Sequence, residues 1–99
     1  MSSMNTEQIE KNLKELKGWN YEEPMIQKKF EFNDFREAFS KMTAIAFVAE
    51  EHQHHPDWKN SYNTLEISLT SHDEGGITDK DFKMAKAIEK ALKWQVNFK

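Results

Sequence analysis

Histidine is the residue type whose placement in this sequence suggests chemistry. The chain has four histidines, and three of them lie within Glu50-Glu51-His52-Gln53-His54-His55-Pro56, with the fourth at His72. An imidazole titrates near neutral pH, so it can both accept and donate a proton. Several imidazoles around one substrate would suit a reaction that adds or removes water, because one ring can protonate a leaving hydroxyl while another removes a proton elsewhere. Neighbouring carboxylates such as Glu50 and Asp81 could fix the tautomer and orientation of the rings.

These residues also have structural interpretations. The histidines before Pro56 could form a solvated helix C-terminus, where they interact favourably with the helix dipole. Asp81 follows Thr78 by three residues, as in a capping box, so capping a helix is its simpler role, although one carboxylate can do both. For Glu50 a solvated helix face is the simpler interpretation, and Trp58 is of a type that more often packs than binds a ligand.

A metal site is the sharper alternative, because His54, His55, His72 and Asp81 have suitable donor atoms. The spacing is poor, however. Adjacent histidines point in divergent directions in an extended segment, and the chain has neither a His-x-x-x-His motif nor any cysteine. We therefore predict that the site holds no metal.

Composition excludes several classes of function. The 14 basic and 17 acidic residues give a formal net charge of −3, which disfavours nucleic-acid binding. The absence of cysteine excludes disulfides and thiol catalysis, and it fits a reducing compartment. The longest nearly apolar run, residues 43–49, is far shorter than the roughly 20 residues that cross a bilayer. No signal-peptide pattern is present, so we expect a cytoplasmic protein without a membrane segment.

The length of 99 residues predicts one domain, residues 1–99, with residues 1–4 disordered. A chain of this size buries only about two-thirds of the surface that its unfolded state exposes. A large interior cavity is therefore not expected. The site should be a surface cleft, or one that a second subunit completes.

A short helix and two strands are predicted in the first third of the chain. The helix is capped by Asn5 or Thr6 and ends at Gly18, because apolar residues recur at i, i+4 and i+7 between them. These apolar residues are Ile9, Leu13 and Leu16. Residues 19–21 and residues 25–32 then read as two strands of a hairpin.

A long helix is predicted from Asp34 to near Gln53. Asp34 and Glu37 have the form of a capping box, and Pro56 disfavours helical geometry at the residue before it. The two adjacent histidines should therefore lie at the exit of this helix. Its expected buried face, flanked by Ala38 and Ile45, consists of Phe35, Phe39, Met42, Ala46 and Ala49.

Residues 58–70 contain the clearest strand, since apolar and polar residues alternate along it. Thr78 should cap a last helix that buries Ala85, Ile88 and Leu92. The resulting order predicts an α+β fold. One antiparallel sheet would carry two long helices packed on one face, with a short N-terminal helix.

The histidine segment resembles a family, the pterin-4a-carbinolamine dehydratases. Their signature is an acidic residue, three residues, His-His-Pro, a nearby Trp, Tyr-Asn, a strand, a His, and an Asp about nine residues later. The matching residues here are Glu50, His54-His55-Pro56, Trp58, Tyr62-Asn63, residues 65–70, His72 and Asp81. The resemblance covers roughly residues 7–95, and its combined spacing is far more specific than His-His-Pro alone.

The resemblance implies loss of water from a 4a-hydroxytetrahydropterin, giving a quinonoid dihydropterin. It implies catalytic roles for His54, His55 and His72, with Asp81 supporting His72 or shaping the site. It also implies a set of substrate-binding residues, which are Glu50, Pro56, Trp58 and Ser71. The family fold has four antiparallel strands and three helices, so residues 58–70 could split into two strands.

The resemblance further implies that no cofactor is needed, because the pterin is itself the substrate, and that the chain forms a homodimer or homotetramer. The alternative is a non-catalytic module on the same fold that binds a pterin or a protein. The intact histidine signature argues against this alternative, since such a role needs no catalytic histidines.

Overall fold

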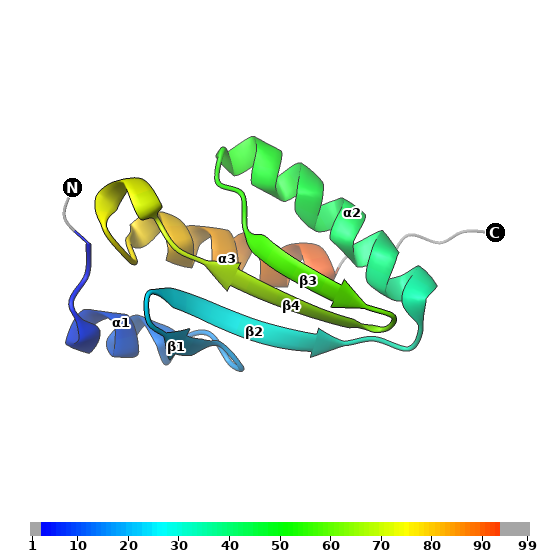
Figure 1. The fold of residues 1–99 in the computed structure, drawn as a ribbon, viewed down its shortest axis with the longest axis horizontal. Helices are drawn as coiled ribbons and strands as arrows, with labels where there is room; N and C mark the ends of the chain where they lie inside the picture. The colour runs from blue at the N-terminus through cyan, green and yellow to red at the C-terminus, as the bar shows by residue number, and fades with distance from the viewer. Residues whose placement is uncertain (1–2, 94–99) are drawn as a thin grey trace.

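The computed structural model describes residues 3–93, which contain three α-helices and four strands (Figure 1). In chain order these are α1 Thr6–Leu13, β1 Asn20–Glu22, β2 Met25–Glu31, α2 Phe35–His52, β3 Asp57–Ser61, β4 Thr64–Leu69, a 3₁₀ helix η1 His72–Glu74, and α3 Asp79–Leu92. The strands form one antiparallel sheet in the order β1-β2-β4-β3. The predicted α+β fold is confirmed. No helix among the described residues is long and apolar enough to cross a membrane.

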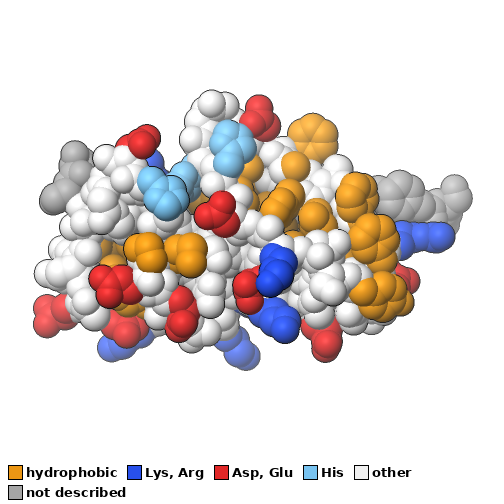
Figure 2. Space-filling model, in the orientation of Figure 1, with side chains coloured by type: hydrophobic (Ala, Val, Ile, Leu, Met, Phe, Trp, Pro, Cys, Tyr) orange, Lys and Arg blue, Asp and Glu red, His pale blue; other side chains and the backbone are white. Residues whose placement is uncertain are grey.

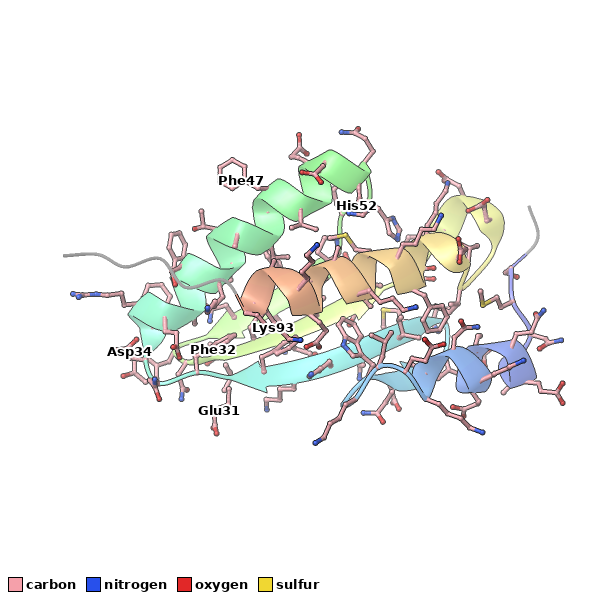
Figure 3. The ribbon with its side chains drawn as sticks, turned by 180° about the vertical axis from the view of Figure 1, so that it is seen from behind. Glu31, Phe32, Asp34, Phe47, His52 and Lys93 are labelled. Carbon is pink, nitrogen blue, oxygen red and sulfur yellow. The ribbon has the colours of Figure 1, made fainter. Side chains whose placement is uncertain are left out.

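The strand β4 lies inside the sheet between β2 and β3, and its side chains show how the two faces of the sheet differ. Its apolar residues Leu65, Ile67 and Leu69 are at most 1% exposed and belong to the core. The helices α2 and α3 lie side by side across this face (Figure 3). The other face carries polar side chains such as Glu66. The alternation that predicts a one-sided sheet is therefore observed.

The strand region predicted at residues 58–70 is two strands. The chain reverses at Tyr62 and Asn63, and Ser61 then pairs with Thr64. Tyr62 adopts the left-handed conformation, with φ of 49°. The sequence pattern alone does not separate β3 from β4, because Tyr62 and Asn63 interrupt the run without a glycine or proline.

The prediction of the buried face of α2 is wrong for its phenylalanines. Phe35 and Phe39 are 46% and 55% exposed. Ala46, also predicted on this face, is exposed as well, whereas Ala49 is buried as predicted, together with the flanking Ala38 and Ile45. Apolar residues occupy so much of the circumference of α2 that periodicity alone does not show which part faces the core.

The N-terminal helix is shorter than predicted. Asn5 caps it in a capping box with Gln8, but it ends at Leu13 rather than near Gly18. Leu16 is buried all the same, because it packs on the core from the turn that follows the helix. Of the segment expected to be disordered, residues 1–2 lie outside the described residues, whereas the backbone N–H of Met4 donates to Ile77 O at 2.7 Å.

Candidate active site

Four chain segments meet at one end of the sheet (Figure 1). They are the end of α2, the start of β3, the end of β4 and the start of α3. The helix α2 ends at His52, and Gln53 then adopts the left-handed conformation, with φ of 51°. The backbone N–H of His54 donates to Ala49 O at 3.1 Å, which holds the exit of the helix in place. The start of β3 lies beside the end of β4, because Asp57 pairs with Ser68. Figure 2 shows the histidine side chains gathered at this end of the molecule.

The central contact of the site joins His54 to Asp81. The Nε2 atom of His54 lies 2.6 Å from Oδ1 of Asp81. The Asp81 side chain is 0% exposed and the His54 side chain is 14% exposed. The two residues are 27 positions apart in sequence, so the docking of the α3 N-terminus against the end of α2 creates this pair.

The second oxygen of Asp81 is held by α3 and by the loop before it. Asp81 Oδ2 accepts the backbone N–H of Thr78 at 2.9 Å and the hydroxyl of Ser71 at 2.9 Å. The capping box predicted for Thr78 and Asp81 is therefore present. The two interpretations of Asp81 do not compete, since one oxygen caps the helix while the other contacts a histidine.

His55 has a different environment. Its Nε2 atom lies 2.5 Å from Oε2 of Glu50, but the two side chains are 59% and 71% exposed. Solvent screens such a pair, so it contributes little to stability. Its ring is nevertheless oriented by a carboxylate and open to a ligand.

His72 is exposed at the start of η1, and its side chain makes no hydrogen bond or ion pair with residues 3–93, although its backbone carbonyl accepts the N–H of Gly75 at 3.1 Å. The support of His72 by Asp81 that the resemblance implied as one option is not made, because the carboxylate contacts His54 instead. Ser71, expected to bind substrate, lies beside Asp81. It is only 7% exposed, and its hydroxyl is engaged with Asp81.

A hollow of about 350 Å³ adjoins His54 between the end of α2 and the start of α3. Its lining residues are His52, Gln53, His54, Lys80 and Lys83. The sequence analysis missed Gln53, Lys80 and Lys83 as lining residues. Lys80 directly precedes Asp81, which is the signal that could have identified it. His52 marks this end of α2 in Figure 3.

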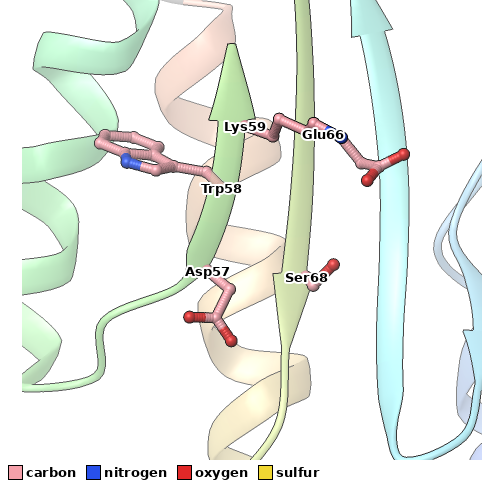
Figure 4. A pocket seen from close by; sticks show the side chains of 5 residues that line it. All are labelled: Asp57, Trp58, Lys59, Glu66 and Ser68. Atoms are coloured by element: carbon pink, nitrogen blue, oxygen red, sulfur yellow. The ribbon is translucent and has the colours of Figure 1, made fainter.

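A shallower depression of about 120 Å³ lies at the β3 edge of the sheet, lined by Asp57, Trp58, Lys59, Glu66 and Ser68 (Figure 4). The Trp58 side chain points toward α2, whereas Lys59 lies beside Glu66 over the polar face. Trp58 is 37% exposed and Pro56 is half-buried, so both are accessible to a ligand near the histidines. In residues 3–93, no three His, Asp or Glu side chains are grouped so that they could hold a metal ion.

Comparisons with known proteins agree on one family. Residues 2–91 match the sequence model of the family described as "Pterin 4 alpha carbinolamine dehydratase". A relative from Christiangramia forsetii, named "Putative pterin-4-alpha-carbinolamine dehydratase", is 52% identical over 90% of this chain and 92% of its own. A relative of the same name from Prochlorococcus marinus is 46% identical over 85% of this chain and 84% of its own.

Solved structures show the same fold. A transcriptional coactivator/pterin dehydratase from Brucella melitensis superposes with a TM-score of 0.87 and 33% identity, over 92% of this chain and 99% of that one. A pterin dehydratase-like protein, described as a RuBisCO assembly factor in the alpha-carboxysome, has a TM-score of 0.62. It is 20% identical over 75% of this chain and 86% of its own, so it is evidence for the fold alone.

Proposed function

The chain belongs to the pterin-4a-carbinolamine dehydratase family, and from this premise we propose that it removes water from a 4a-hydroxytetrahydropterin to give a quinonoid dihydropterin. The observation that carries the proposal is the 2.6 Å contact between His54 and the buried Asp81. A carboxylate that orients an imidazole beside an open hollow is the arrangement that proton transfer requires.

The reaction needs two proton transfers and no redox step. The C4a–O bond breaks, the hydroxyl leaves with an added proton as water, and the ring system of the pterin gives up one proton to a base. His54, oriented by Asp81, exchanges one of these protons. His55 and His72 are exposed and are available for the second transfer and for binding the pterin. No metal or cofactor takes part, because the pterin itself supplies the electrons that expel the hydroxide.

We propose different roles for the other residues that were expected to contact the substrate. Glu50 acts by orienting His55, while Pro56 and Trp58 follow the histidine pair in the chain and remain accessible. Ser71 acts on Asp81 rather than on the pterin, because its hydroxyl is buried in that contact.

The experiment follows the disappearance of freshly generated 4a-hydroxytetrahydropterin by its absorbance, with and without the protein. General acid–base groups contribute roughly 10²–10⁴-fold to such rates, so His54→Ala and His72→Ala should each slow the catalysed reaction strongly. Asp73→Ala, next to His72 and also exposed, is the matched control and should keep the wild-type rate. Full activity in both histidine variants would refute the assigned site.

The same assay separates the alternative function. A non-catalytic pterin- or protein-binding module would bind its partner without accelerating dehydration. The same fold occurs in a protein described as a RuBisCO assembly factor, so the fold alone does not decide between the two functions. Pterin binding without any acceleration by the wild-type chain would favour it.

We also propose that the chain forms a homodimer or homotetramer in the cytoplasm, where the absence of cysteine suits the reducing environment. Among residues 3–93, the large hydrophobic side chains that are exposed lie on α2, on β3 or at the β3–β4 turn. This exposed aromatic surface consists of Phe35, Phe39, Phe47, Trp58 and Tyr62. Figure 2 shows apolar side chains gathered over this flank. It includes part of β3, an edge strand of the sheet formed by residues 3–93, and an edge strand offers backbone groups that can pair with a second copy of the chain.

A further inference from the structure

We infer that a directional chain of hydrogen bonds fixes the tautomer of His54, so that Nδ1 is its reacting nitrogen and Ser71 and Thr78 are positioning residues. This inference deepens the proposed function and rests on it. It concerns which atom of His54 exchanges the proton, which the spacing of residues in the sequence does not determine.

The direction of the chain is set by backbone groups that can only donate. The hydroxyl oxygen of Thr78 accepts the backbone N–H of Lys80 at 3.2 Å and, within the capping box, the backbone N–H of Asp81. A hydroxyl has two acceptor lone pairs and one hydrogen. Thr78 Oγ1 is an acceptor in the cap, and because the single hydrogen of Ser71 goes to Oδ2 of Asp81, Thr78 donates at its contact with Ser71.

The Oγ atom of Ser71 lies 2.9 Å from Oγ1 of Thr78. Ser71 accepts at this contact, and its own hydrogen is directed to Oδ2 of Asp81 at 2.9 Å. The backbone N–H of Thr78 reaches the same oxygen. Two donors, the Ser71 hydroxyl and the Thr78 backbone N–H, therefore point at Oδ2 of Asp81 and stabilise the charge of its carboxylate.

An ionised carboxylate has no hydrogen to give, so at its contact with Oδ1 the Nε2 atom of His54 must be the donor. In the neutral ring, the proton then lies on Nε2 and the free lone pair lies on Nδ1. Among residues 3–93, Nδ1 has no hydrogen-bond partner, and it is not among the side-chain atoms buried without one. It is thus not fully buried, and the His54 side chain lines the hollow beside it.

The catalytic consequence is that His54 accepts a proton at Nδ1. The resulting imidazolium keeps its Nε2–H bond to Asp81, whose negative charge compensates the new positive charge. The proton then leaves from the same nitrogen. Ser71 and Thr78 do not touch the pterin; they hold Oδ2 of Asp81 so that Oδ1 faces Nε2 of His54.

The test is the tautomer of His54, read from long-range ¹H–¹⁵N correlations of the full chain labelled with ¹⁵N-histidine, at a pH where the imidazoles are neutral. We expect a proton on Nε2 and none on Nδ1. A wild-type spectrum with the proton on Nδ1 would overturn the inference. The measurement needs no substrate, so an inactive protein with the expected tautomer would refute the proposed function alone, and an active protein with the other tautomer would refute the inference alone.

Asp81→Asn provides a second measurement. The two donors hold the carbonyl oxygen of the new amide at the Oδ2 position, which turns its NH₂ group toward Nε2 of His54. The ring must then accept there, so the proton moves to Nδ1. The rate should fall toward the roughly 10⁴-fold loss that the equivalent substitution causes in a serine-protease triad. Asp79→Asn, two residues earlier and exposed, should change neither the tautomer nor the rate. An unchanged tautomer in Asp81→Asn would contradict the inference.

Ser71 is tested by rescue. Ser71→Ala removes one hydrogen bond to a charged oxygen of Asp81, which remains an acceptor, so we expect His54 to keep its Nε2–H tautomer but to be held less firmly, with a rate about tenfold lower. Ser71→Thr keeps the hydroxyl and should restore the rate. A full rate in Ser71→Ala would show that Ser71 is not a positioning residue.

Discussion

Replacing each of the adjacent histidines by alanine should affect stability very differently. His54→Ala leaves Oδ1 of Asp81 without its partner, and this carboxylate is 0% exposed. An unpaired buried charge costs several kcal/mol, but Asp81 keeps two donors on Oδ2, so we expect a loss of about 2–3 kcal/mol. His55→Ala breaks a pair whose side chains are 59% and 71% exposed, and it should cost less than about 0.5 kcal/mol.

Thermal and urea unfolding measure this difference. For a domain of this size, a loss of 2–3 kcal/mol lowers the unfolding midpoint by roughly 10–20 °C, whereas His55→Ala should shift it by only a few degrees. His54→Gln is the control for the cause of the loss, because its side-chain NH₂ can replace the Nε2–H donor to Asp81. It should recover most of the stability lost in His54→Ala. Equal shifts in the two alanine variants would show that the contact between His54 and Asp81 does not stabilise the fold.

Three further changes test other parts of the structure. Glu89→Ala removes the acceptor shared by the Trp19 indole N–H and the Lys28 ammonium, both at 2.8 Å. We expect the free energy of unfolding to fall by about 1–2 kcal/mol, and an unchanged urea midpoint would contradict this. Gln53→Gly relieves the strain of a left-handed backbone, with φ of 51°, and should raise the free energy of unfolding by about 0.5–1 kcal/mol. A lower calorimetric midpoint would refute this reasoning. Phe47 is 72% exposed, and Phe47→Asp should convert the proposed oligomer to a monomer, as measured by sedimentation velocity. An unchanged sedimentation coefficient would exclude the proposed interface.

Local signals in the sequence predict the parts of the fold that depend on local chemistry. The caps at Asp34 and Thr78, the exit of α2 before the histidine pair, and the alternation along β4 all agree with the structure. In each case the deciding interactions lie within a few residues of one another. The turn at Tyr62 and Asn63 is the exception, because a tyrosine in the left-handed region carries no recognisable turn signal.

Features that depend on docking between elements were not predictable in the same way. The orientation of α2 is decided by contacts with α3 and the sheet, and the pattern of its apolar residues does not contain that information. The partner of Asp81 is likewise set by how α3 meets the end of α2, which places His54 rather than His72 against the carboxylate. The residue types of the site could be predicted from sequence, but the pairing among them required the tertiary structure.

The most direct test of the central claim is the rate of dehydration of 4a-hydroxytetrahydropterin by the wild-type chain and by His54→Gln, each measured on protein shown to be folded. The account predicts that wild-type protein accelerates the loss of the substrate absorbance and that His54→Gln is slower by roughly 10²–10⁴-fold, because its amide can hold Asp81 but cannot exchange a proton. A wild-type rate in His54→Gln would contradict the assignment of His54 as the proton-transferring residue, and no acceleration by the wild-type chain would contradict the proposed function.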